Sequence, residues 1–133
     1  MNPIEIYCKL RLDPGSMPRA LDLARALIES ARPIWAGKFP AVLRCDWFVH
    51  DATQECIGML AYRDDAALIA HRVAAAQSFA ALERTGMLGV RFLGRPSADA
   101  FLHWAHLSPS VVEFDSGITG TPGAAQYRDR SAA

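Results

Sequence analysis

The sequence predicts an α+β domain in which two helices cover one face of a four-stranded antiparallel sheet. The chain has 133 residues, enough for one domain, and 51% of them are hydrophobic, so it can bury a core. Segments in which apolar and polar residues alternate predict strands, and segments with apolar residues every three or four positions predict helices. These segments follow one another as strand, helix, strand, strand, helix, strand.

The first strand and the first helix have the clearest patterns. Residues 4–12 alternate between apolar and polar side chains, which predicts a strand with one apolar face. Asp13-Pro14-Gly15 predicts a turn, and Ser16 can cap the helix that follows. The apolar residues of that helix form one stripe: Met17, Ala20, Leu21, Ala24, Leu27, Ile28 and Ala31. Pro33 is expected to end the helix, because proline disfavours helical backbone at the residue before it.

The middle of the chain predicts a hairpin and a long helix. Residues 42–50 and about 54–62 are expected to be strands, joined through the polar segment 51–53. The pattern leaves their register open, and a slip of one residue would move every side chain of a strand to the opposite face. A single helix is expected from the aspartates at 64–65 to about Arg84, with Gly86 just beyond its end.

The last part of the chain predicts an extension to this core. Residues 87–93 are expected to form the fourth strand, and Ser97 can cap a short helix at 98–106. A short fifth strand is expected at 110–115. From Gly117 onward the sequence has no period and few large apolar residues, so we expect a domain at 1–116 and a loosely ordered tail at 117–133.

This order of elements predicts a ferredoxin-like βαββαβ sandwich with a C-terminal helix and strand added. Both helices cover one face of the sheet, and the other face needs a partner. On the first strand that face carries Glu5, Tyr7, Lys9 and Arg11. In either register the next two strands add some of Trp47, Phe48, Met59, Leu60 and Tyr62 to it. Because such an apolar and aromatic surface seldom stays exposed, we expect two sheets to pack face to face in a twofold homodimer.

Composition and charge exclude several classes of function. Fourteen basic residues balance fourteen acidic ones, which argues against a nucleic-acid partner. No apolar run reaches the roughly 18 residues that a membrane helix needs, so no membrane partner is expected. The N-terminal residues do not resemble a signal peptide. The odd set of Cys8, Cys45 and Cys56 argues against a disulfide framework and favours buried thiols and a cytoplasmic location.

Residues 56–71 resemble a segment of a known superfamily. They read Cys56-Ile57-Gly58-Met59-Leu60-Ala61-Tyr62-Arg63-Asp64-Asp65-Ala66-Ala67-Leu68-Ile69-Ala70-His71. A third strand, an Asp-rich helix start, Ala-Leu and then Ala-His is similar to the pattern of the dimeric α+β barrel superfamily, and within it of the antibiotic-biosynthesis-monooxygenase-like proteins. The order of elements agrees over residues 4–93. The chain departs from the family pattern at 39–42, which lacks the usual Gly and Glu, and in continuing through 96–118.

This resemblance implies that two sheets pair into a dimeric α+β barrel that binds a small molecule. It also implies a cofactor-independent monooxygenase acting on a small aromatic or polyketide-like substrate. The alternative is a non-catalytic module on the same dimer that binds a small ligand or haem.

His71, Arg44 and Asp46 are the candidates for catalysis. His71 lies beside the apolar stripe of its helix and could reach a cavity rim, where an imidazole serves as acid, base or ligand. The resemblance implies a pocket-lining or iron-binding role there, and the alternative is a histidine that packs and bonds to nearby backbone. Arg44, Asp46 and His50 share one face of their strand. On a buried face they would anchor a ligand, and on an exposed face they would be solvated edge charges.

Four aromatic residues are the candidates for substrate binding: Tyr7, Trp47, Phe48 and Tyr62. Their rings could stack on a planar ligand or fill the core or the dimer interface. His103 and His106 have a spacing that suits two metal ligands, but no third ligand has a suitable spacing, so no metal site is expected. Nucleotide, flavin and hydrolase motifs are absent from the sequence, and no cofactor is expected.

Overall fold

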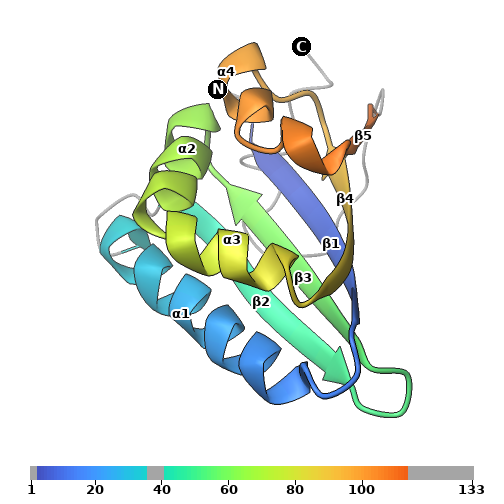
Figure 1. Ribbon diagram of the computed structural model, residues 1–133. Coiled ribbons are helices and arrows are strands. Elements are labelled where there is room, and N and C mark those ends of the chain that lie inside the picture. Colours follow the sequence, from blue (N-terminus) through green and yellow to red (C-terminus); the bar gives the residue numbers. More distant parts are fainter. Residues whose placement is uncertain (1–2, 36–40, 114–133) are drawn as a thin grey trace, which may run out of the picture.

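The computed structural model describes residues 3–35 and 41–113, which form a sheet with helices on one of its faces (Figure 1). Its strands are β1 (Ile4–Leu12), β2 (Val42–His50), β3 (Glu55–Tyr62), β4 (Gly86–Leu93) and β5 (Ser110–Val112). Its helices are α1 (Met17–Trp35), α2 (Asp65–Ala74), α3 (Ala76–Glu83), α4 (Ala98–Leu102) and the 3₁₀ helix η1 (Ala105–Leu107). The strand order is β2-β3-β1-β4-β5, antiparallel except for β5, which runs parallel to β4. The predicted ferredoxin-like α+β fold is therefore confirmed.

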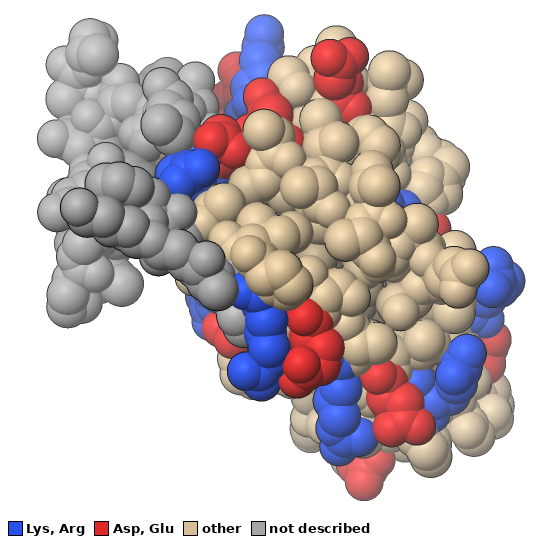
Figure 2. Space-filling model, turned by 90° about the vertical axis from the view of Figure 1, so that its left-hand side faces the viewer, with Lys and Arg blue, Asp and Glu red and all other residues tan. Residues whose placement is uncertain are grey.

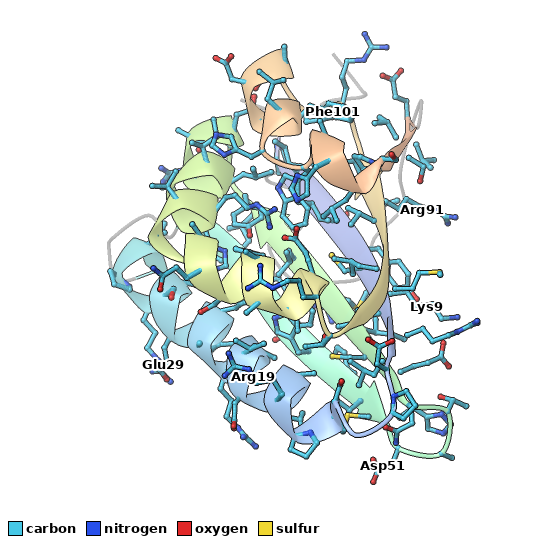
Figure 3. The ribbon with its side chains drawn as sticks, viewed as in Figure 1. Lys9, Arg19, Glu29, Asp51, Arg91 and Phe101 are labelled. Atoms are coloured by element: carbon cyan, nitrogen blue, oxygen red, sulfur yellow. The ribbon has the colours of Figure 1, made fainter. Side chains whose placement is uncertain are left out.

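The sheet has a covered face and an open face, and strand pairing assigns each residue to one of them. On the covered face lie Ile4, Ile6, Cys8, Leu10, Leu12, Cys45, Trp47, Val49, Cys56, Gly58, Leu60, Tyr62, Leu88, Val90 and Phe92. On the open face lie Glu5, Tyr7, Lys9, Arg11, Arg44, Asp46, Phe48, His50, Glu55, Ile57, Met59, Ala61, Met87, Gly89, Arg91 and Leu93. Helices α1, α2 and α3 pack on the covered face, and no described helix covers the open face (Figure 1). Lys9 and Arg91 accordingly point away from the helices (Figure 3).

The β2–β3 hairpin sets the register that the sequence pattern left open. Residues 51–54 form the turn. In it Gln54 has a φ of 53°, and its backbone N–H donates a hydrogen bond to the Asp51 carbonyl oxygen at 3.2 Å. His50 then pairs with Glu55, and a register shift lies between Val42 and Arg44. This register puts Phe48 and Met59 on the open face. It puts Trp47, Leu60 and Tyr62 on the covered face.

Two helix predictions are wrong in detail. Helix α1 continues past Pro33 to Trp35. Proline removes one helical hydrogen bond, and in the last turn the helix has few bonds left to lose. The predicted long second helix is two helices, separated at Ala75, whose φ of −111° and ψ of 23° are not helical. Neither Gly nor Pro lies at this break, so the residue types that commonly interrupt a helix do not account for it.

The capping predictions are confirmed for two helices. The Asp64 carboxylate accepts a hydrogen bond from the Ala67 amide at 2.9 Å, at the start of α2. The Ser97 hydroxyl accepts one from the Ala100 amide at 3.1 Å, at the start of α4. Gly86 is not a helix cap but the first residue of β4, where a Cβ would lie 2.0 Å from the Arg11 carbonyl oxygen. The two strands therefore approach closely at a point that only glycine allows.

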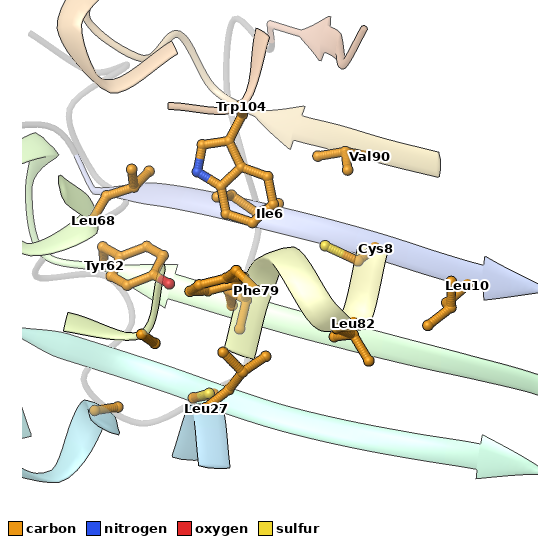
Figure 4. Close-up of a cluster of buried hydrophobic side chains, with 14 of the residues drawn as sticks. Ile6, Cys8, Leu10, Leu27, Tyr62, Leu68, Phe79, Leu82, Val90 and Trp104 are labelled. Atoms are coloured by element: carbon orange, nitrogen blue, oxygen red, sulfur yellow. The ribbon is translucent and has the colours of Figure 1, made fainter. Parts of the chain in front are cut away.

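The extension after β4 is part of the core. Trp104 is fully buried and packs edge-on against the rings of Phe79 and Phe92, at centroid distances of 5.5 and 6.2 Å (Figure 4). Helix α4 ends at Leu102, earlier than predicted, and a 3₁₀ turn follows. Strand β5 ends at Val112; residues 114–115 of the predicted strand and the predicted tail at 117–133 lie outside the described residues.

Charge is spread over the surface without one sign prevailing. On the side shown in Figure 2, basic and acidic residues alternate along the lower part and border a broad uncharged region. Among the residues that the structure describes, no helix is long and apolar enough to cross a membrane. The surface in this view shows no basic field of the kind that nucleic acids require.

Candidate functional site

The structure divides the predicted site residues between the two faces of the sheet. Tyr7, Arg44, Asp46 and Phe48 come together on the open face. Trp47, Tyr62 and His71 lie on the opposite side, between the sheet and the helices. The four aromatic residues therefore do not line one binding site. Each group is a separate candidate.

The open-face group surrounds an apolar centre. Met59 pairs with Tyr7 on one side and with Asp46 on the other, so these three residues run across three strands. Ile57 and Phe48 form part of the next row. The Phe48 side chain is 51% exposed, which is high for a large aromatic residue. The centre of this face is thus apolar and uncovered by any described helix.

The polar residues of the open face are paired and solvated. Arg44 Nε donates to Asp46 Oδ2 at 2.6 Å, and these side chains are 44% and 50% exposed. Within one copy of the chain, Arg44 and Asp46 therefore lie on an exposed face, which a second copy could still cover. His50 Nδ1 lies 2.7 Å from the Thr53 hydroxyl at the hairpin turn. A hydrogen bond from Thr53 and the ion pair with Lys9 lower the pKa of Glu55.

His71 lies in the packed core and not at a cavity rim. Its Nε2 lies 2.8 Å from the Leu27 carbonyl oxygen, which only accepts, so Nε2 carries the hydrogen. Its Nδ1 lies 2.7 Å from the Tyr62 hydroxyl and accepts from it in the neutral imidazole. Burial lowers the pKa of His71 and raises that of Tyr62 well above its usual range. Both ring nitrogens are therefore used within the protein, in the packed and hydrogen-bonded arrangement that was the alternative to a catalytic histidine.

Trp47 packs against a glycine on the covered face. A Cβ on Gly58 would lie 2.5 Å from the Trp47 ring, so the indole occupies the space above that residue. The indole Nε1 is buried and makes no hydrogen bond with any of the residues described. Trp47 is therefore a partly buried residue that packs against the core, and its ring fits there because residue 58 has no side chain.

Arg72 is a buried residue that the sequence patterns did not single out. Its guanidinium lies over the rings of Phe79 and Trp104, 4.5 and 4.4 Å from their centroids. Arg72 Nη2 donates to Glu83 at 2.8 Å, and Nε donates to the His103 carbonyl at 3.1 Å. The residues in contact around this guanidinium belong to α2, α3 and the extension. The only sequence signal is that Arg72 lies next to the apolar stripe of its helix.

The two histidines of the extension do not form a metal site in the described part of the chain. His106 Nε2 pairs with the Glu83 carboxylate, and the His103 carbonyl, not its ring, contacts Arg72. Residues 3–35 and 41–113 hold no group of three or more metal-ligating side chains. The predicted helix 98–106, which would put both rings on one face, ends at Leu102, so His103 follows α4 and His106 lies in η1.

The cysteines are free and buried, as their apolar surroundings predicted. Burial raises the pKa of Cys8 to about 12 and that of Cys45 to about 11. Since the thiolate is the reactive form, these thiols are not nucleophiles at neutral pH.

A pocket with a volume of about 810 Å³ lies in the extension, away from every predicted site residue. Its lining residues are Arg95, Pro96, Ser97, Ala98, Phe101, Leu102, Val111 and Glu113. Five of these are apolar, and the ion pair between Arg95 and Glu113 joins the β4–α4 segment to the end of β5. Sequence patterns do not show this pocket, because its walls come from segments that pair only in the folded chain.

The sequence matches no protein-family model and no curated protein sequence. Solved structures do match. MupZ from Pseudomonas fluorescens is similar with a TM-score of 0.70 and 13% identity, over 92% of this chain and 97% of that one. A crystallised antibiotic biosynthesis monooxygenase is similar with a TM-score of 0.55 and 18% identity, over 71% of this chain and 99% of that one. A protein from Mycobacterium tuberculosis is similar with a TM-score of 0.59 and 17% identity, over 72% of this chain and 97% of that one.

These likenesses differ in how much of the chain they cover. The antibiotic biosynthesis monooxygenase and the mycobacterial protein cover little more than two thirds of it, whereas MupZ covers nearly all of it. The likeness to MupZ thus includes more than a βαββαβ core. At sequence identities of 13–18%, these likenesses show that the chains share a fold. The chain has the fold of the antibiotic-biosynthesis-monooxygenase-like proteins.

Proposed function

We propose that this chain is a homodimeric small-molecule-binding protein that acts as a cofactor-independent monooxygenase on a small aromatic or polyketide-like substrate. The observation that carries the proposal is that Tyr7, Arg44, Asp46 and Phe48 share the open face, with Met59 between Tyr7 and Asp46. The fold, shared with an antibiotic biosynthesis monooxygenase, supports it. The open face would form one wall of a chamber between two copies.

The open face has both exposed apolar residues, which a second copy would bury, and charges of both signs, which a second copy could pair. Phe48 and Met87 are 51% and 76% exposed, and burying each fully would contribute about 1.5–3 kcal/mol. The same face carries cations such as Lys9 and anions such as Glu55. A twofold axis can place groups of opposite sign from two copies against each other. Facing sheets would thus bury the apolar centre and keep the charges paired.

In such a chamber the residues of the open face would bind and activate an acidic CH₂ or phenolic compound. Tyr7 and Phe48 would stack on its rings. The Arg44 guanidinium would stabilise the enolate, and Asp46 would hold that guanidinium in place. The acidic CH₂ group would lose one proton to solvent, and the resulting anion would add O₂. The peroxide formed would take a proton back and lose water, which leaves a carbonyl group. The protein contributes orientation and charge stabilisation, and the substrate supplies the electrons.

Oxygen uptake with a panel of quinols and anthrone-like substrates tests this function. We expect uptake with at least one substrate and a loss of at least tenfold in kcat/KM for Arg44→Ala. Arg25→Ala is the matched control, because Arg25 also forms an exposed ion pair with a nearby aspartate, Asp22, but on α1. Absence of uptake across the panel, or equal rates in both variants, would contradict the proposal.

A non-catalytic ligand-binding module is the second candidate. The described residues favour it in one respect: His71 has no free ring nitrogen, and the thiols of Cys8 and Cys45 stay protonated. Haem is not the ligand that this geometry favours, because iron would have to displace Leu27 or Tyr62 from His71. Titration with haem should therefore give no Soret shift. A Soret band that is lost in His71→Ala would reverse this conclusion.

A further inference from the structure

We propose that the pocket of the extension is a second ligand site, and that it takes an uncharged small molecule with a ring. Its residues lie outside the proposed chamber on the open face. The proposal therefore does not depend on the function proposed above. It rests on the rigidity of the pocket, its apolar walls and the balance of charge at its edge.

The floor of the pocket is tied to the core on several sides. Phe101 contacts the buried ring of Phe92, with the centroids 6.0 Å apart. The Ser97 amide donates to the Asp65 carboxylate of α2 at 3.2 Å. The Gly94 amide donates to the Val112 carbonyl at 2.8 Å and holds β5 beside β4. The walls are therefore fixed by the fold, and a ligand would find the pocket formed.

The walls expose apolar surface that a ligand would cover. Leu102 is 69% exposed and Val111 is 41% exposed, although both line the pocket. Phe101, a half-buried aromatic residue of α4, lines the same pocket (Figure 3). The volume of about 810 Å³ falls among small-molecule sites, which span about 300–1,000 Å³. An apolar body with a ring suits these walls.

The charged residues at the edge of the pocket determine which net charge a ligand can have. Arg95 and Glu113 form an ion pair with each other, and they are the charged residues among those that line the pocket. An anion would gain Arg95 but meet Glu113, and a cation would gain Glu113 but meet Arg95. An uncharged ligand can accept a hydrogen bond from Arg95 and donate one to Glu113 without breaking this balance. The site thus selects against ions of either sign.

Two fluorescent probes with the same skeleton test both halves of the proposal. N-phenyl-1-naphthylamine is uncharged, and 8-anilino-1-naphthalenesulfonate adds one sulfonate to that skeleton. In titrations of the full chain we expect the uncharged probe to bind at least tenfold more tightly. Leu102→Glu should weaken its binding at least tenfold. Val73→Glu is the matched control, because Val73 is also an exposed apolar residue but lies on α2 outside the pocket.

Each outcome has a defined meaning. Equal binding of the two probes would overturn the assignment to an uncharged ligand. Equal binding of the uncharged probe to wild type, Leu102→Glu and Val73→Glu would overturn the site. Sedimentation of Leu102→Glu separates this proposal from the dimer: a change in its association state would show that Leu102 belongs to an interface between copies, which also overturns the proposal. An unchanged association state with lost probe binding supports it, whether or not the open face has oxygenase activity.

Discussion

The helix-covered side of the sheet and the open face contain the same kinds of polar group in different surroundings. On the covered side Arg72 and Glu83 form an ion pair whose side chains are 9% and 12% exposed. On the open face Arg44 and Asp46 form one whose side chains are 44% and 50% exposed. His71 uses both ring nitrogens inside the core, whereas His50 bonds to a surface threonine. Buried polar groups fix the fold, and solvated ones leave a face free to meet another molecule.

The largest difference between the two sides should appear at two neighbouring residues of β3. Leu60 is buried on the covered face, so Leu60→Lys should lower the free energy of unfolding by at least about 4 kcal/mol. Met59 lies on the open face, so Met59→Lys should change the stability of the fold little but weaken the dimer. Urea denaturation and sedimentation equilibrium measure the two effects.

Two outcomes would contradict this assignment of faces. A loss of stability in Met59→Lys as large as that in Leu60→Lys would mean that both residues are in the core. A wild-type chain that sediments as a monomer at micromolar concentration would show that the open face does not bind a second copy.

The buried Arg72–Glu83 and exposed Arg44–Asp46 ion pairs should differ in how much they contribute to stability. Arg72→Ala removes one of the two partners of Glu83, leaving His106, and it removes the cation that lies over Phe79 and Trp104, so it should cost about 3 kcal/mol. Arg44→Ala should cost less than about 1 kcal/mol, because its ion pair is solvated. Denaturation in urea compares both with wild type. Equal costs would show that burial does not determine the strength of these pairs.

Two glycines offer a comparison with a smaller expected effect. Gly58→Ala brings a methyl group within 2.5 Å of the Trp47 ring and should cost about 1–3 kcal/mol. Gly89→Ala, on the open face, meets nothing nearer than the Lys9 carbonyl oxygen at 3.9 Å. Thermal unfolding should therefore show a lower Tm for the first variant and little change for the second. A well-tolerated Gly58→Ala would mean that Trp47 does not occupy the space above residue 58.

The smallest effect concerns pH. Burial lowers the pKa of His71 in the folded chain, so below a pH of about 6.5 the unfolded chain binds a proton that the folded chain does not. The free energy of unfolding should fall as the pH decreases from about 6.5 through the folded pKa, with a slope of at most about 1.4 kcal/mol per pH unit from this residue. His71→Gln should remove this component, and His50→Gln should not. The same pH profile in all three proteins would contradict the buried, neutral His71.

Much of the fold could be predicted because its core is made of local patterns. The alternation over residues 4–12 predicts which side chains of β1 are buried, and Asp64 and Ser97 act as the predicted caps. The predicted stripe of α1 is correct except that it omits the buried Leu23 and includes Leu21 and Ile28, which are only partly buried. These features depend on neighbours within a few residues, so the sequence displays them directly. The extent of α1 past Pro33 and the break at Ala75 have no such local signal, because Pro33 itself predicts an earlier end and neither Gly nor Pro lies at the break.

The candidate site could be predicted only in part, because it depends on register and on distant contacts. Arg44, Asp46 and Phe48 share a face in any register, since they alternate along one strand. Trp47 and Tyr62 could not be assigned to a face before the turn at residues 51–54 was known. The surroundings of Arg72 come from α3 and the extension, up to 34 positions away, and no local pattern signals such a meeting. The catalytic and binding roles of these residues stay predictions.

The burial of Trp104 has a consequence for how the chain is made. This indole is among the largest fully buried side chains, and it fills the space between α3 and β4. During synthesis the ribosome releases the sheet strands β1 to β4 before residue 104 emerges. Until then Phe79 and Phe92 lack their aromatic neighbour, and Arg72 lacks one of its two stacking rings. The hydrophobic core of the domain is therefore complete only once the extension has folded onto the sheet and its helices.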